Sequence, residues 1–117
     1  MDAEGLKELF EPFGVVTVRR MFGGSGVYSD GLCFAIALGG EVYIKADAET
    51  KAAFETAGSL PFVYLAQGKP TTVSYWRLVA EAYDDTDALK RWAGLGLAAA
   101  QRAAAKKAAR PVRAKRR

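Results

Sequence analysis

The stretch VVTVRRMFGGSGVYSDGLCFAIALGGEVYIKA, residues 15–46, decides the fold of this chain. It holds four runs rich in β-branched and aromatic residues, which predict strands over 15–22, 26–29, 32–38 and 41–46. The connectors Ser29-Asp30-Gly31 and Gly39-Gly40 are short enough for hairpins. The stretch therefore predicts an antiparallel meander.

Helical patterns lie on both sides of this meander. Asp2 is expected to cap a first helix that ends near Pro12 and Gly14, and its apolar face is formed by Leu6, Leu9, Phe10 and Phe13. Asp47 is expected to cap a second helix over 48–57, and Gly58 is expected to end it. The side chains of this helix expected to face the core are Ala53, Phe54 and Ala57.

Two strands and a third helix complete the pattern. Pro61 opens a strand over 61–66, and the Gly68-Lys69-Pro70 turn leads into a strand over 71–78. A long helix is expected to begin near Asp84, Asp85 and Asp87, because negative charge is favourable at the N-terminus of a helix. The residues expected to form its buried stripe are Leu89, Trp92, Ala93, Leu97 and Ala100. The order α-β-β-β-β-α-β-β-α predicts a two-layer α+β domain, with helices packed on an antiparallel sheet.

Composition narrows the class of protein. At 117 residues the chain forms one domain that can bury a core without disulfides or metals. Its apolar runs are far shorter than a membrane span, and its N-terminus lacks the pattern of a signal peptide, so we expect a cytoplasmic protein with no membrane contact. The single cysteine, Cys33, is expected to be a reduced core residue.

The chain contains no histidine. This removes the commonest general base, the commonest zinc ligand and every Ser-His or Cys-His nucleophile pair. No calcium-loop pattern is present either. We therefore expect no enzyme activity, no catalytic residue, no metal and no cofactor.

Charge is divided unevenly along the chain. Eight of the 17 Lys and Arg residues follow Gln101 without any acid, which leaves nine cations against 13 acids, or −4, in residues 1–101. We predict a domain over 1–101 and a basic tail over 102–117, helical to about Ala109 and disordered past Pro111 unless bound. The cations expected to contact nucleic-acid phosphates without sequence preference are Arg102, Lys106, Lys107, Arg110, Arg113, Lys115, Arg116 and Arg117. A solubilising tail is the alternative, as are acidic protein or anionic lipid partners.

The glycines of RRMFGGSGVY, residues 19–28, raise the question of a phosphate-binding loop. No Lys-Ser or Lys-Thr follows them, as a Walker loop requires, and a strand rather than a helix comes next. The pattern predicts a hairpin turn or bulge in which glycines adopt positive φ, with Phe22 and Tyr28 packing across it.

Three other groups of side chains are candidate sites. Arg19 and Arg20 should point to opposite faces of a strand. One of them is expected to pair with an acid such as Glu41 or to lie over the sheet. The alternative is that the exposed arginine contacts a ligand or a partner. Tyr43 and Lys45 should share a face, either as part of a half-exposed strand or as a proton-transfer pair. Aromatic residues of the later strands are expected in the core or in cross-strand pairs, with a stacking surface for bases as the alternative: Tyr64, Tyr75 and Trp76.

One run resembles the M-F-G-G-x-G-x-Y signature of the TfoX/Sxy N-terminal domain family, through Arg20, Met21, Phe22, Gly23, Gly24, Gly26 and Tyr28. More of the family pattern follows in register over roughly residues 3–102, including Tyr43-x-Lys45-x-Asp47, Pro61-Phe62-x-Tyr64 and Leu89-x-x-Trp92. The resemblance implies a fold of the secretion-chaperone-like type, a structural role for the signature, and no catalytic residue. It also implies a part in regulating DNA-uptake competence together with a transcription activator.

The sequence thus predicts a non-enzymatic regulatory protein that acts through a protein partner, with nonspecific DNA-backbone contacts from the tail. The alternative is a protein-interaction module or a small chaperone-like homodimer with no DNA role.

Overall fold

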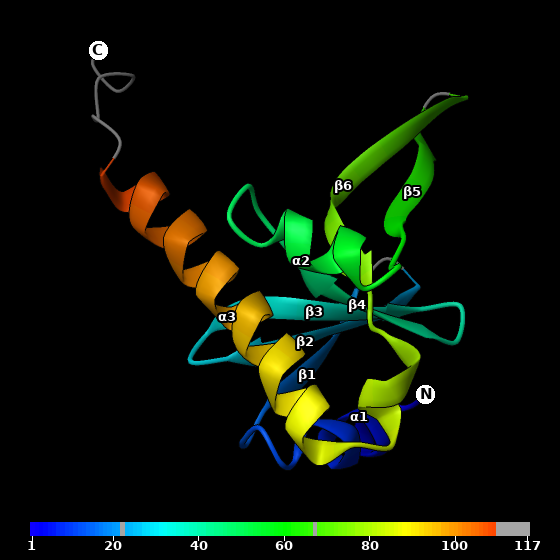
Figure 1. Cartoon of the computed structure of the whole chain (residues 1–117), viewed down its shortest axis with the longest axis vertical. Coiled ribbons are helices and arrows are strands. Elements are labelled where there is room, and N and C mark those ends of the chain that lie inside the picture. The colour runs from blue at the N-terminus through cyan, green and yellow to red at the C-terminus, as the bar shows by residue number, and fades with distance from the viewer. Residues whose placement is uncertain (22, 67, 110–117) are drawn as a thin grey trace.

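The computed structural model describes residues 1–21, 23–66 and 68–109, and only the backbone of residues 64–66 and 69–73. Its elements follow the expected order with one addition, a short 3₁₀ helix before the last helix (Figure 1). They are α1 (Ala3–Phe10), β1 (Thr17–Met21), β2 (Gly24–Ser29), β3 (Leu32–Leu38), β4 (Glu41–Lys45), α2 (Lys51–Thr56), β5 (Pro61–Ala66), β6 (Lys69–Arg77), η1 (Ala80–Tyr83) and α3 (Thr86–Ala109).

All the strands form one antiparallel six-stranded sheet in the order β1-β2-β3-β4-β6-β5. The predicted α+β class with helices packed on an antiparallel sheet is confirmed. Two of the hairpins turn through pairs of residues with positive φ, Asp30-Gly31 and Gly39-Gly40, as two-residue connections require. The hairpin of β5 and β6 projects away from the rest of the molecule, on the side of the sheet opposite α1 (Figure 1).

The core lies between the helices and one face of the sheet. Phe34 of β3 is fully buried, and its ring packs against Phe10 and Phe13 at 5.3 and 5.4 Å between centroids. α2 joins the same layer because Phe54 lies between Trp76 of β6 and Trp92 of α3. The three helices therefore cover a single face of the sheet.

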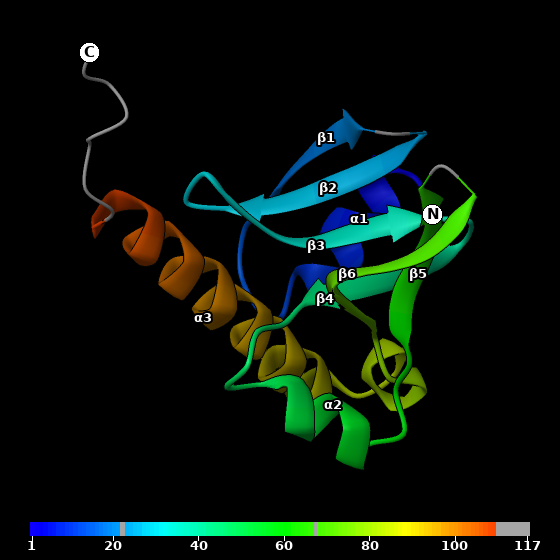
Figure 2. The same ribbon diagram turned by 90° about the horizontal axis from the view of Figure 1, so that it is seen from above.

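The opposite face carries no helix over it in the part of the chain that the structure describes (Figure 2, where α1 lies behind the strands). We call it the open face. Strand alternation places on it Thr17, Arg19, Met21, Gly24, Gly26, Tyr28, Cys33, Ile36, Leu38, Glu41, Tyr43, Lys45, Tyr75 and Arg77. Cys33 is half-buried here and accepts a hydrogen bond from the Tyr75 hydroxyl at 3.6 Å, so its assignment to the core is wrong. A bulge in the β2–β3 pairing places both Phe34 and Ala35 toward the helices and leaves Cys33 outside.

The glycine run is only partly a turn. Gly23 has φ +76°, but Gly24 and Gly26 lie inside β2. This strand begins at Gly24, two residues before its predicted start at Gly26. The expectation of positive φ is therefore wrong for these two. A Cβ on Gly24 would run into the Ala37 carbonyl oxygen, and one on Gly26 would lie 2.5 Å from Met21 Sδ. Gly24 is therefore needed for close approach to the backbone of β3, and Gly26 leaves room for the Met21 side chain. Phe22 lies outside the described residues.

The helix ends follow their sequence signals in two of three cases. Asp2 Oδ1 accepts from the Gly5 N–H at 2.8 Å, and Asp85 Oδ1 accepts from the N–H groups of Asp87 and Ala88. α2 begins later than predicted, at Lys51, with Thr50 as its N-cap, and Ala57 is exposed.

Asp47 does not cap α2 directly. It organises the turn that precedes this helix, because its carboxylate accepts from the Glu49 N–H and its own N–H donates to Thr50 Oγ1. Gly58 ends α2 as expected, with φ +80° and a bond from the Ser59 N–H to the Phe54 carbonyl.

Candidate nucleic-acid interface

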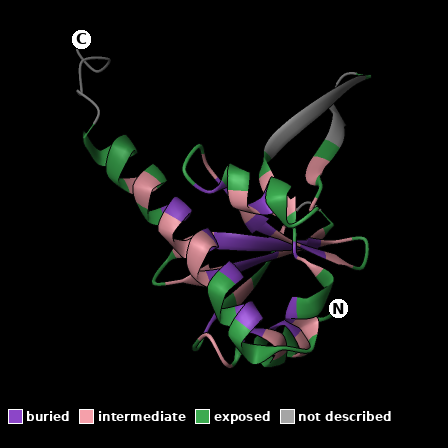
Figure 3. Cartoon of the chain, in the orientation of Figure 1, coloured by how far each residue is buried: buried purple, intermediate pink, exposed green. Residues whose placement is uncertain are grey.

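The last helix changes character along its length. From Ala88 to Ala100 it buries a stripe against the sheet, and beyond Gln101 its residues are exposed or half-buried (Figure 3). Of the predicted stripe, Leu97 alone is only half-buried. The C-terminal end of α3 therefore extends past the sheet and carries Lys106 and Lys107 into solvent.

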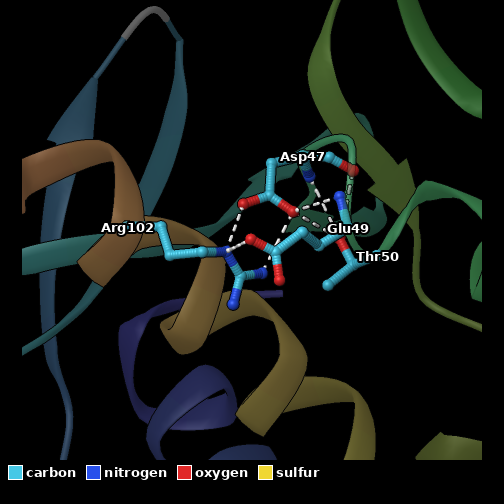
Figure 4. Close-up of polar contacts among 4 residues, drawn as sticks. All are labelled: Asp47, Glu49, Thr50 and Arg102. Atoms are coloured by element: carbon cyan, nitrogen blue, oxygen red, sulfur yellow. Dashed lines mark hydrogen bonds and ion pairs between the residues drawn. The ribbon is translucent and has the colours of Figure 1, made fainter. Parts of the chain in front are cut away.

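Arg102 is the first cation of the predicted tail, and the structure ties it to the domain. Its Nε donates to Asp47 Oδ2 at 2.7 Å and its Nη2 to Asp47 Oδ1 at 3.0 Å, a two-pronged contact (Figure 4). Glu49 Oε2 lies 3.3 Å from the same Nε. The turn described above positions the Asp47 carboxylate for this contact, which joins α3 to the residues after β4.

The electrostatics follow from this geometry. The hydrogen bond from Arg102 lowers the pKa of Asp47, and the bond to Asp47 raises the pKa of Arg102. Both groups stay charged at neutral pH. Arg102 is therefore engaged by carboxylates and is the member of the predicted tail set least able to meet a phosphate.

An open cleft of about 470 Å³ lies between the residues after β4 and the last turns of α3. Its charged lining consists of two acids and four cations, which are Asp47, Glu49, Lys45, Arg102, Lys106 and Lys107. Both acids contact Arg102. None of the three lysines forms an ion pair with a described residue. The cleft can accept an anion such as a phosphate.

Lys45 is the residue of this cleft that the sequence did not connect with the tail. It is separated from Lys106 by α2, two strands and most of α3, and no local pattern links the two. Asp47 as the anchor of Arg102 was missed for the same reason. The other predicted tail cations lie outside the described residues: Arg110, Arg113, Lys115, Arg116 and Arg117.

The other candidate side chains are dispersed. Arg19 and Arg20 point to opposite faces of β1 as expected, but Glu41 pairs with Arg77 at 3.7 Å instead of with either. Arg19 lies over the ring of Tyr28, whereas Arg20 borders an open pocket beside Met1 and Asp2.

The remaining candidates divide between the two faces of the sheet. Tyr43 and Lys45 share the open face, the first packed on Phe62 and the second over the ring of Tyr75. Trp76 belongs to the core, and the side chain of Tyr64 lies outside the described residues. Burial, together with the hydrogen bond to Cys33, raises the pKa of Tyr75, which therefore stays protonated at neutral pH. No group of potential metal ligands occurs within the described ranges 1–21, 23–66 and 68–109.

The fold and the cleft define a class: a small α+β domain with an open sheet face and a basic helical extension. The TfoX N-terminal domain family matches residues 8–100, and the chain belongs to this family. Of the signature residues that the structure describes, Met21, Gly24, Gly26 and Tyr28 lie together on the open face, whereas Gly23 lies in the turn before β2 and Arg20 points to the opposite face. No curated protein matches the chain. No helix in the described part is long and apolar enough to cross a membrane.

Proposed function

We propose that the protein is a non-enzymatic regulatory protein of the competence type. It acts through a protein partner, such as a transcription activator, and holds nucleic acid by phosphate contacts from its basic tail. Family membership supports the regulatory role. The observation that supports the phosphate contacts is the course of α3, which leaves the sheet and exposes Lys106 and Lys107 in a segment with no acid after Gln101.

The tail is suited to backbone contacts and not to base readout. Reading bases requires side chains fixed in a groove, whereas Lys106 and Lys107 sit on an exposed helix end without hydrogen-bond partners among the described residues. Any promoter preference would therefore come from the partner protein.

A salt titration tests the proposal. The full chain is titrated against two unrelated duplexes at several salt concentrations, beside the double variant Lys106→Gln/Lys107→Gln. If about six cations meet phosphates, log K against log salt should have a slope of about −5, and a fourfold rise in salt should weaken binding about a thousandfold. The double variant should reduce that slope by about 2.

Lys90→Gln is the matched control, because Lys90 is an exposed lysine at the opposite end of the same helix. It should leave the slope unchanged. An equal effect from both variants would show only a general loss of charge. Absence of binding at low salt would leave the interaction module without a DNA role as the better description.

A further inference from the structure

We propose that the open face of the sheet is a binding surface for single-stranded nucleic acid, which lays its bases on the tyrosines and its phosphates on Arg19, Lys45 and Arg77. This site shares Lys45 with the cleft beside the tail, but its other residues lie away from the tail and it does not depend on the function proposed above. It rests on the charge, the ring contacts and the register of the side chains on this face.

The charge of the open face differs from that of the rest of the domain. Its described side chains include three cations and a single acid, Glu41, whereas residues 1–101 as a whole carry nine cations and 13 acids. The acids are gathered instead on the helices and on the turns beside them. A polyanion that approaches the domain is therefore attracted to this face and repelled by the helical side.

Two of the three cations lie on aromatic rings. The Arg19 guanidinium carbon is 5.6 Å from the ring centroid of Tyr28, and Lys45 Nζ is 5.3 Å from that of Tyr75. No acid of the described residues forms an ion pair with either of them. A base can take the place of each cation over the ring while the cation moves to a neighbouring phosphate, so that both contacts of a nucleotide are supplied at one place.

The glycines of the signature leave room for neighbouring side chains on this face. At Gly26 a Cβ would lie 2.5 Å from Met21 Sδ and 3.0 Å from Tyr28 Cε1, so both side chains rest on the sheet only because no side chain stands between them. The hydroxyl of Tyr75 is held by Cys33 and the ring of Tyr43 by an edge contact with Phe62 at 4.9 Å. The rings are thus fixed before any ligand binds, which lowers the entropy cost of stacking.

The register sets the length of the site. One row crosses five neighbouring strands without a break: Arg19, Gly26, Ile36, Tyr43 and Arg77. At about 4.8 Å between strands its two arginines lie about 19 Å apart. A single strand of about four nucleotides spans the distance between the two arginines. This length is at the lower end of the range of about 4–16 nucleotides that single-strand sites on small β domains cover.

A duplex does not suit this surface. Its bases are already stacked and its grooves admit a helix or a narrow ribbon, whereas the surface of a six-stranded sheet meets only the phosphates. The open face is therefore expected to prefer single strands, and the tail to bind both forms equally.

The test uses the full chain and fluorescence anisotropy with a labelled 12-mer of dT, a 12-mer of rU and a 12-base-pair duplex at low salt. The unmodified chain should bind both single strands at least tenfold more tightly than the duplex. Arg19→Gln/Arg77→Gln should weaken single-strand binding about tenfold, and Tyr43→Leu about fivefold, while duplex binding stays the same. The dT and rU arms show whether the face distinguishes the two sugars.

Arg91→Gln is the matched control. Arg91 is also exposed and also stacked on an aromatic ring, 4.6 Å from the centroid of Trp92, but it lies on α3. It should leave both affinities unchanged. Equal weakening of single-strand binding by Arg91→Gln, or a single-strand affinity that Arg19→Gln/Arg77→Gln leaves unchanged, would overturn the proposal.

An NMR titration of the unmodified chain with dT 12-mer covers the case of a variant that fails to fold. Amide shifts should concentrate at Arg19, Tyr43 and Tyr75, and shifts confined to residues after Gln101 would equally reject the site. Loss of duplex binding in Lys106→Gln/Lys107→Gln concerns only the tail, so the two proposals fail separately.

Discussion

The two faces of the sheet use the same strands in opposite ways. The covered face presents large apolar side chains such as Phe34 and Ile44, which are fully buried beneath the helices. The open face presents half-buried tyrosines and exposed arginines, with Gly26 and Ile36 buried between them. The difference shows that stability resides on one face, while the other is free to carry binding groups. Five experiments test this contrast, from the largest expected effect to the smallest.

Truncation of the core should have the largest effect. Phe34→Ala removes a fully buried ring between Phe10 and Phe13 and should lower the free energy of unfolding by about 3–5 kcal/mol. Leu38→Ala, in the same strand but on the open face, should cost about 1 kcal/mol. Urea unfolding of both variants measures the ratio. Similar losses from the two would mean that the open face is itself part of the core.

Filling the close approach at Gly24 comes next. Gly24→Val places a branched side chain against the Ala37 carbonyl and Leu38, and should destabilise by about 1–3 kcal/mol through overpacking. Ser25→Val is the control, since this neighbour in β2 points to the other face and valine favours strands. Thermal unfolding of the pair decides whether steric contact, rather than strand position, is responsible.

Two glycines of α3 should respond with opposite signs. A Cβ on Gly96 would lie 2.6 Å from Ile44 Cγ2 and 2.9 Å from the Phe34 carbonyl oxygen, so Gly96→Ala should destabilise by about 1–2 kcal/mol. Gly94 has open space around it, and Gly94→Ala should stabilise by about 0.5–1 kcal/mol through helix propensity. A stabilising Gly96→Ala would mean that α3 does not sit this closely on the covered face.

The contribution of the Asp47–Arg102 contact to the free energy of unfolding should depend on pH. The pKa of Asp47 is lowered by Arg102 from an ordinary value of 3.8, so the folded chain binds this proton less readily than the unfolded chain. Its contribution is complete above the unfolded pKa and is lost as pH falls through the folded one. Asp47→Asn should cost about 1 kcal/mol at pH 7, because the pair is partly exposed.

The same variant should differ little from the unmodified chain near pH 2. Glu55→Gln serves as the control, because this exposed acid has no ion pair among the described residues. Urea unfolding at pH 7 and in acid gives both differences, and a constant gap across this range would remove Asp47 ionisation as the cause.

Removal of the tail should have the smallest effect. Deletion of 103–117 keeps every buried residue and the Arg102 contact, so the thermal midpoint should shift by no more than a few degrees. Circular dichroism during heating measures it. An unfolded chain after the deletion would show that the extension of α3 belongs to the domain.

Local signals predicted much of this fold. Strand alternation, two-residue turns, the cap at Asp2 and the acids at the start of the last helix act over a few residues, so the sequence alone specified the order of elements and the α+β class. The signals failed where a neighbour distant in sequence intervenes. Gly24 and Gly26 were interpreted as turn residues, but the backbone of β3 leaves no space for a Cβ at Gly24, and the Met21 side chain packs against Gly26.

By itself the sequence determined the family, the strand order along the chain and the presence of a basic segment after Gln101, because each depends on residue types at short spacing. Only the tertiary structure decided that Asp47 holds Arg102, that Lys45 borders the same cleft as Lys106, and that cations and tyrosines gather on one uncovered face. These contacts join residues that are far apart in the chain. Their formation depends on which strands pair and which face the helices cover, and no spacing within the sequence records that choice.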